Sequence, residues 1–406
     1  MERLSTAERL RTALAQVTGR ALGPYQSAVV RIGFAGTWLF FLLREFPNRH
    51  ELYGPDGPWS WELARRLVET NRAFTVLLWS DSTLWFETVY ALSVLASLLL
   101  LLGWRTRGTS VVFMVGVLSL QNRSVFMGDG GDNVIHLMAI YLVLTRCARV
   151  WSLDARRIRL RGSAAAGAAG PALWAVLGGF LVYGVFAGGF GAGWTAAFVA
   201  LWVGAGLWWL VERYDDPAGG GERRALLDVL ANLLHNAGML VIMAEVCLIY
   251  ATAGWYKIQG SRWQDGTALY YPLGLDYFTP WPGLSEVLAG SGTLVMLLTY
   301  GTVAVQVAFP FTLFNRRVKN VLLAVMMLEH LGIAVLLGLP FFSLAMIAAD
   351  AVFLPTAALV WAGARAGAVA GVAAGWWGPR GTGPAPAAVA AEAQADAGAQ
   401  AGVGAR

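Results

Sequence analysis

A lysine in an aromatic, glycine-rich stretch is the residue of this chain best suited to chemistry. Lys257 lies in AGWYKIQGSRWQDG, which runs from Ala253 to Gly266 directly after a long apolar run. The stretch also contains Trp255, Tyr256, Trp263 and Asp265. At the water edge of a membrane helix, a lysine either keeps its ammonium in water as an anchor or, in a poorly solvated site, loses its proton more readily and serves as a base. The sequence leaves both anchoring and proton abstraction open.

Four more ionisable residues stand well inside apolar runs, where a charge is costly and needs a partner or a proton. They are Glu245, Glu329, His330 and Asp350. One interpretation is that these groups satisfy one another and hold helices in register. The other is that they line a cavity and handle protons, since a histidine at mid-membrane can also hydrogen-bond a quinone or a peptide carbonyl.

The spacing of these residues gives two geometric expectations. Glu329 and its neighbour His330 should point to different faces of one helix. Lys257, at the start of a turn, should be able to pair with Glu245 or Asp265. We therefore expect a candidate site between the helices that carry Glu245, His330 and Asp350, covered by the Lys257 turn.

The composition indicates that these residues belong to a membrane protein. Of the 406 residues, 57% are apolar and only 14% are charged, whereas soluble proteins have about 25% charged residues. Crossing the hydrocarbon core takes about 20 apolar residues. Runs of roughly that length lie at 27–44, 84–103, 106–122, 133–147, 172–189, 194–211, 233–252, 292–314, 318–338 and 341–361. The sequence predicts an all-α, polytopic helical bundle with about ten transmembrane helices.

Basic clusters fix the expected orientation. Arginines and lysines gather in alternate loops, which the positive-inside rule assigns to the cytoplasm together with both termini. The long aromatic loops 45–83 and 253–291 then face the opposite side, so the candidate site is expected to be extracytoplasmic, in a bacterial inner membrane. The net charge of +5 is small and scattered, which argues against nucleic acid as a partner and for membrane lipids.

The chain divides into three predicted regions. Residues 1–26 form an amphipathic cytoplasmic segment, 27–362 the transmembrane domain, and 363–406 a disordered Ala/Gly-rich tail. Cys147 and Cys247 lie in apolar runs without a CxxC or Cys/His cluster, so no metal site is predicted.

Four segments together are similar to one family. They are YATAGWYKIQGSRWQDGTALYY, RTRGTSVVFMVGVLSLQNRSVFMGDGGDNVIHLMAIYLVL followed by WSLDA, the early RIGFAGTWLF and the late EHLGIAVLLGLPFFSLAMIAAD. Over roughly residues 27–360 the chain resembles the horizontally transferred transmembrane (HTTM) family, which is related to the membrane part of vitamin K-dependent gamma-glutamyl carboxylase.

The resemblance implies a role for Lys257 and also shows a departure. In the carboxylase, a lysine in the equivalent turn is the base that deprotonates vitamin K hydroquinone. The histidine that the carboxylase has before its W-S-V-D is replaced here by Arg149, and an arginine cannot transfer protons there. The apolar pair at 172–211 is additional to the family pattern, and the chain has no room for the carboxylase's large lumenal domain.

Three functions remain open. The first is a quinone-dependent membrane enzyme of the carboxylase or epoxidase type, with Lys257 as base, His330 or Glu245 lining the cavity, and menaquinone or vitamin K hydroquinone as cofactor. The second is an accessory protein, with a co-encoded partner, for the maturation or export of a secreted peptide toxin. The third is a non-catalytic lipid-binding or transport scaffold.

Overall fold

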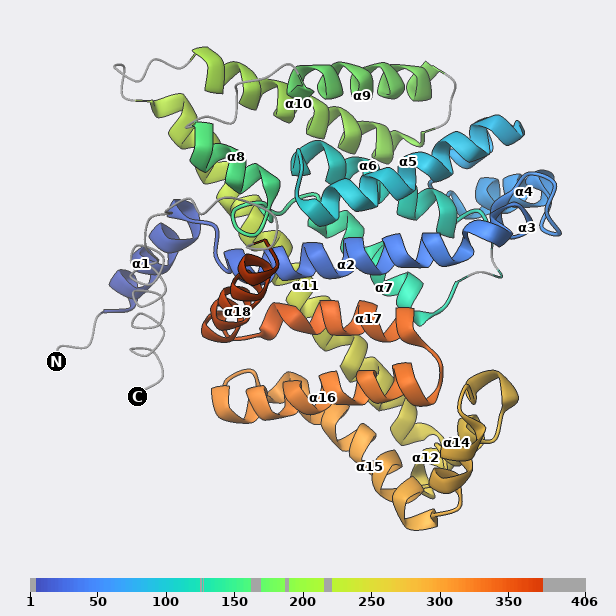
Figure 1. The fold of residues 1–406 in the computed structure, drawn as a ribbon. Helices are drawn as coiled ribbons and strands as arrows, with labels where there is room; N and C mark the ends of the chain where they lie inside the picture. The colour runs from blue at the N-terminus through green and yellow to red at the C-terminus, as the bar shows by residue number, and fades with distance from the viewer. Residues whose placement is uncertain are drawn as a thin grey trace.

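The fold is a bundle of long helices, seen in a computed structural model that describes residues 5–124, 126, 128–161, 169–186, 190–214 and 221–374. Within these ranges all regular structure is helical, as predicted (Figure 1). The helices of the first half are α1 (Thr6–Gly19), α2 (Pro24–Glu45), α3 (Arg49–Tyr53), α4 (Trp61–Asn71), α5 (Thr83–Leu102), α6 (Thr106–Gln121), α7 (Gly130–Leu142), α8 (Leu153–Arg161), α9 (Ala169–Phe186) and α10 (Ala192–Tyr214). Those of the second half are α11 (Glu222–Gln259), α12 (Ser261–Gln264), α13 (Tyr270–Leu273), α14 (Pro282–Ala289), α15 (Gly292–Ala308), α16 (Arg316–Leu336), α17 (Pro340–Asp350) and α18 (Thr356–Ala374).

Seven helical stretches in the described part of the chain are long and apolar enough to cross a membrane, which indicates a multi-pass membrane protein. They contain α2, α5, α9, α10, α11, α15 and α16. The expectation of about ten spans is too high by this measure. The runs at 106–122 and 133–147 form α6 and α7, which are shorter than 18 residues, and the run at 341–361 is divided between α17 and α18.

The last predicted span is broken rather than continuous. After α17 the chain makes a 3₁₀ turn at Ala351–Phe353, and Leu354 is extended with ψ 140°. Leu354 precedes Pro355, whose ring disfavours a helical conformation in the residue before it. Helix α18 then starts at Thr356 and continues to Ala374, so the start of the predicted disordered tail is helical. The rest of that tail, residues 375–406, lies outside the described residues.

The short elements gather at the two ends of the long helices. In Figure 1, α1, α8 and α18 lie toward one end, and α3, α4, α12 and α14 lie toward the other. The second end carries both aromatic loops, so these loops share one face of the bundle, as the charge pattern predicts. We call the end with α1 and α8 the basic end and the other the aromatic end.

One buried arginine joins three segments at the basic end. Arg31 in α2 is fully buried. Its guanidinium donates to the Leu100 and Leu101 carbonyls at the end of α5, the latter at 2.7 Å, and to the carbonyls of Cys147 (3.2 Å) and Trp151 (2.7 Å). The last turn of a helix has carbonyls without intrahelical partners, so Arg31 supplies donors that α5 lacks.

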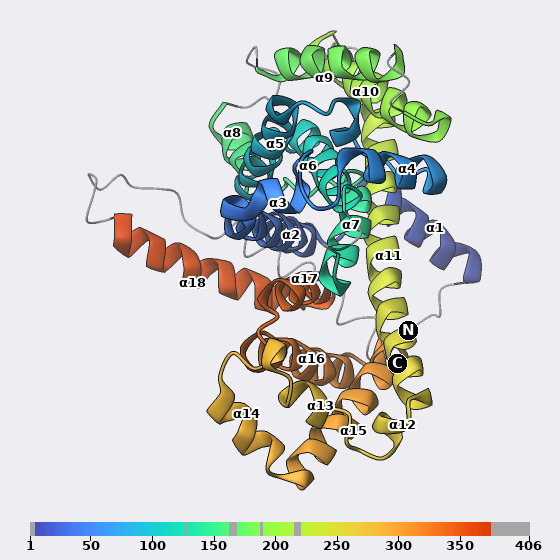
Figure 2. The ribbon, with the colours of Figure 1, turned by 90° about the vertical axis from the view of Figure 1, so that its right-hand side faces the viewer.

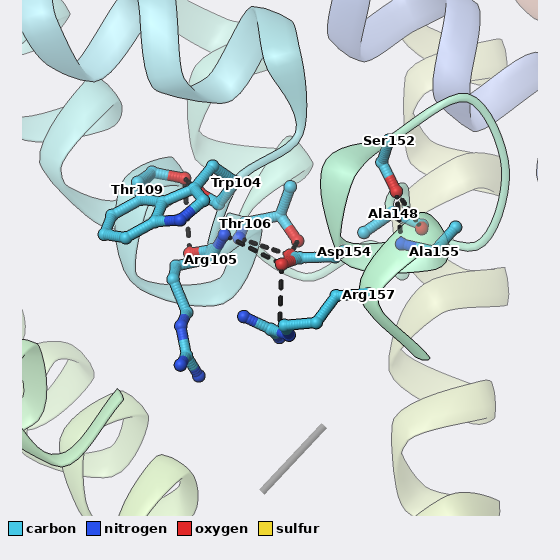
Figure 3. A network of polar contacts seen from close by, with 9 residues as sticks. All are labelled: Trp104, Arg105, Thr106, Thr109, Ala148, Ser152, Asp154, Ala155 and Arg157. Atoms are coloured by element: carbon cyan, nitrogen blue, oxygen red, sulfur yellow. Dashed lines mark hydrogen bonds and ion pairs between the residues drawn. The ribbon is translucent and has the colours of Figure 1, made fainter. Parts of the chain in front are cut away.

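Asp154 completes the same junction from α8 (Figure 3). Its carboxylate accepts hydrogen bonds from the Arg105 backbone N–H (3.0 Å), the Thr106 N–H (2.9 Å) and the Thr106 hydroxyl (2.9 Å), and it pairs with Arg157 at 3.2 Å. Asp154 therefore caps the start of α6, although it lies far from α6 in the sequence.

The N-terminal segment is an amphipathic helix held against α11. Helix α1 starts with a capping box formed by Ser5 and Glu8. Side chains of α11 bind the backbone near its other end: Asn232 donates to Thr18 O at 2.9 Å, Asn236 donates to Val17 O at 2.8 Å, and a His235 ring nitrogen lies 2.7 Å from Leu22 O.

At the aromatic end, Arg123 holds the first long loop together. Its guanidinium is buried and donates to the carbonyls of Trp59 (2.9 Å) and Gly54 (2.7 Å). Burial lowers the pKa of Arg123 to about 10, so the guanidinium is still charged at neutral pH.

Replacing Asp154 with alanine should destabilise the fold. The change removes the cap of α6 and the partner of Arg157, and we expect a loss of about 1–3 kcal/mol. Thermal unfolding in detergent, followed by size-exclusion chromatography, measures the effect. The exposed Asp81→Ala is the matched control, and equal stability of the two variants would contradict the capping role.

Candidate functional site

Helix α11 carries the central residues of the site on one face. Tyr250, Gly254 and Lys257 follow one another at helical spacing. Helix α11 extends through Gln259, so Lys257 lies in the last helical turn, and the prediction that it lies in a turn beyond the helix is wrong. The apolar run ends earlier than the helix, whose last turns carry aromatic and polar residues such as Trp255, Tyr256 and Gln259.

A glycine brings α15 close to this face. A Cβ on Gly254 would lie 2.6 Å from a Val307 methyl group, closer than real Cβ contacts allow. The absence of a side chain at Gly254 therefore permits the close approach of α11 and α15, which puts Gln306 within reach of Lys257.

Lys257, Gln306 and Glu329 form a chain of hydrogen bonds. The Lys257 ammonium group Nζ donates to Gln306 Oε1 at 2.7 Å, and Gln306 Nε2 donates to Glu329 Oε1 at 2.7 Å. Gln306 is buried, and Lys257 and Glu329 are partly buried. The amide places a neutral group between the lysine and the carboxylate.

A second trio adjoins the first through α16. Tyr250 Oη lies 3.0 Å from His330 Nε2 and 2.9 and 3.0 Å from the two Asp350 oxygens. All three residues are buried. The neighbours Glu329 and His330 thus face different partners, as predicted, and Lys257 is near enough to His330 to interact with it electrostatically.

One nitrogen in this trio lacks a hydrogen-bond partner among the described residues. His330 Nδ1 is buried and accepts or donates no hydrogen bond to any described residue. If the Tyr250 hydroxyl donates to Asp350, its oxygen accepts from the His330 Nε2–H, and Nδ1 is then an unoccupied acceptor. Such an atom has the chemistry to bind a hydroxyl donor.

The other predicted site residues lie apart from the two trios. Glu245 is joined to α7 by the Tyr141 hydroxyl at 3.5 Å. Asp265 is exposed and binds Thr267 and Arg262, so its predicted pairing with Lys257 is wrong, as is the pairing of Lys257 with Glu245.

The aromatic neighbours of Lys257 divide into two groups. The Trp263 ring centroid lies 5.2 Å from Lys257 Nζ, a distance typical of a cation–π contact. Trp255 and Tyr256 are exposed on the outside of α11. Trp263 therefore belongs to the surroundings of Lys257, while Trp255 and Tyr256 face away from the bundle.

Arg149 is far from this site. It follows α7 at the basic end, close enough to Asp228 to interact with it electrostatically. Asp228 and Lys257 stand near opposite ends of α11, roughly 40 Å apart at about 1.5 Å rise per residue. Arg149, which lies near Asp228, is therefore too far from Lys257 for the two side chains to act on one substrate.

Sequence reasoning missed Gln306 and Tyr250 because neither carries a charge. Gln306 is nevertheless the one amide in the apolar sequence of α15, and Tyr250 shares a helix face with Lys257. Among the described residues, no cluster of three or more His, Cys, Asp or Glu side chains could hold a metal ion.

Tyr250→Phe should destabilise the bundle. The change leaves buried Asp350 and His330 without their shared partner, at an expected cost of about 1–2 kcal/mol in a membrane protein. Thermal unfolding in detergent measures the difference. Tyr277→Phe, which alters an exposed tyrosine, is the control. If both variants unfold at the same temperature, the Tyr250 hydroxyl contributes nothing to stability.

No protein-family model, curated protein or solved structure matches the chain. The resemblance to the HTTM family therefore stays a prediction.

Proposed function

We propose that this protein is a quinone-linked membrane enzyme in which Lys257 is the general base. The observation that supports it most is the partner of Lys257: its Nζ binds the neutral amide of Gln306 and no carboxylate of the described chain directly. A lysine in direct contact with a carboxylate is held as ammonium, whereas an amide acceptor is compatible with the neutral amine that a base requires.

The residues around Lys257 fit a hydroquinone. The Trp263 ring offers an aromatic surface beside Nζ, and His330 Nδ1 is a buried acceptor suited to a hydroxyl group. When bound, a hydroquinone would supply an acidic phenolic hydroxyl and reducing electrons.

The chain's own groups then have distinct roles. Lys257 accepts a proton at Nζ, Gln306 orients that nitrogen, and Glu329 offers negative charge to the ammonium that results. Tyr250 and Asp350 hold the His330 ring in place. Since Arg149 is distant and cannot transfer protons, the proposal covers proton abstraction and not a complete carboxylation.

Lys257→Met should abolish base catalysis. Hydroquinones react with oxygen faster after deprotonation, so oxygen consumption with a short-chain menaquinol in nanodiscs reports the base. We expect a fall of about 10²–10⁴-fold, the range typical of general-base catalysis. Lys257→Arg should fall equally, because arginine stays protonated.

Arg262→Met, which removes an exposed cation close by in the sequence, is the matched control and should keep wild-type activity. If Lys257→Met consumes oxygen as fast as the wild type, Lys257 is not the base. A purified protein that retains no quinone and accelerates no oxidation would favour the peptide-handling accessory role instead.

Gln306→Glu tests why an amide lies between the two charges. The new carboxylate would contact the Lys257 ammonium directly and hold its proton. We expect oxygen consumption to drop at least tenfold, and because the second new oxygen faces Glu329, the two carboxyl groups should share one proton. Gln306→Asn, which keeps an amide, should retain more activity than Gln306→Glu. The reverse order would show that the neutral spacer is not required.

A further inference from the structure

A large groove separates the α9–α10 pair from the rest of the bundle. Its volume is about 2160 Å³, at least twice that of pockets for drug-sized ligands, which reach about 1,000 Å³. Figure 2 shows α9 and α10 lying over α5 and α6. Among their described residues only Gly178, Gly184 and Phe198 are buried, so little of either helix is covered by the rest of the bundle.

Contacts at both ends hold the pair at this distance. At the basic end, Gly108 of α6 lies against Leu173, and the Arg107 guanidinium carbon lies 3.9 Å from the Trp208 ring centroid. At the aromatic end, Phe74 stacks on Phe190 at 5.6 Å. The groove lies between these contacts, along the length of the membrane-spanning helices.

The pair itself is a fixed unit. Trp174 of α9 and Trp202 of α10 stack at 4.2 Å, and the indole N–H of each donates to the other's backbone carbonyl at 2.9 Å. Gly178 and Gly206 make room for these rings. The two helices that bound the groove on this side are therefore held together by their own contacts.

The two parts of the groove differ in charge. Its middle is lined by aliphatic side chains of α5, α6 and α9, such as Leu92, Val112 and Leu177. The lining as a whole contains nine arginines and three acidic residues, and the described arginines concentrate at the basic end. The lining thus combines an apolar channel with a positive end.

Several of these arginines have unused hydrogen-bonding capacity. Arg146 is satisfied by Asp228 and Asn232, each at 2.8 Å. In contrast, Arg107 and Arg149 are exposed to the groove and form no ion pair with any described carboxylate. The Nε atoms of Arg105 and Arg157 are buried and lack a hydrogen-bond partner within the described chain.

We propose that this groove is a binding site for an anionic phospholipid, with the phosphate at Arg105, Arg107 and Arg149 and the acyl chains between α9–α10 and α5–α6. Charge complementarity selects the headgroup, because guanidinium groups bind phosphate through paired N–H donors. The positive-inside rule places the basic end at the cytoplasmic leaflet, where anionic lipids and basic pockets between helices meet. A quinone carries no charge and would leave the arginines unpaired.

The test is native mass spectrometry of the full chain in nanodiscs made of equal parts phosphatidylglycerol and phosphatidylcholine. We expect the wild type to retain about one phosphatidylglycerol after release from the disc. Arg107→Gln/Arg149→Gln should reduce that retention at least tenfold. Arg65→Gln/Arg66→Gln, which removes two exposed arginines at the aromatic end, should leave it unchanged.

A second variant separates the apolar channel from the charges. Val112→Trp fills the middle of the groove while every arginine stays, and we expect it also to reduce lipid retention. Retention of phosphatidylcholine at the same level, or unchanged phosphatidylglycerol in both groove variants, would overturn the proposal. Menaquinol oxidation should persist in these variants because Lys257 lies near the other end of α11, so a failure here is distinguishable from a failure of the proposed enzyme function.

Discussion

The buried guanidinium of Arg31 is the interaction on which the arrangement of the bundle depends. A charge with no exposure can be accommodated only if its donors are occupied, and Arg31 occupies them with backbone carbonyls from α5, from Cys147 and from Trp151. Moving any one of these segments would leave a buried charge unsatisfied. Asp154 acts at the same junction, so α2, α5, α6 and α8 are fixed together at the basic end.

The positions of the helices could be predicted from hydropathy, but their continuity could not. Every predicted apolar run coincides largely with one or two helices, because apolar side chains and hydrogen-bonded backbone favour helices in lipid. Helix α7 is shorter than its apolar run, and the last run is interrupted before Pro355. Neither feature is visible in the mean hydropathy of a window, because the residues on both sides of each helix end are mostly apolar. The wide separation of the α9–α10 pair has no signature in either helix, since lipid-facing and groove-facing positions are equally apolar.

At the candidate site, the ionisable residues could be predicted from the sequence, whereas the uncharged residues that join them are known only from the structure. Lys257, Glu329, His330 and Asp350 could be predicted because ionisable groups in apolar runs are rare. Their grouping could not, since it depends on uncharged residues: Gly254 sets the distance between α11 and α15, and Gln306 and Tyr250 connect the titratable groups. Glu245 satisfied the same sequence criterion as the others, yet within the described part of the chain its carboxylate hydrogen-bonds only to Tyr141 of α7.

Both trios put a neutral polar group between titratable ones, and the physical reason is the low dielectric of the membrane. A direct ion pair there is strong, because Coulomb energy scales inversely with the dielectric constant, so the proton would stay on the base. An amide between Lys257 and Glu329, or a phenol between His330 and Asp350, keeps every group hydrogen-bonded while weakening the attraction between the charges. A site whose protons move needs this weakening, in keeping with the proposed proton abstraction by Lys257.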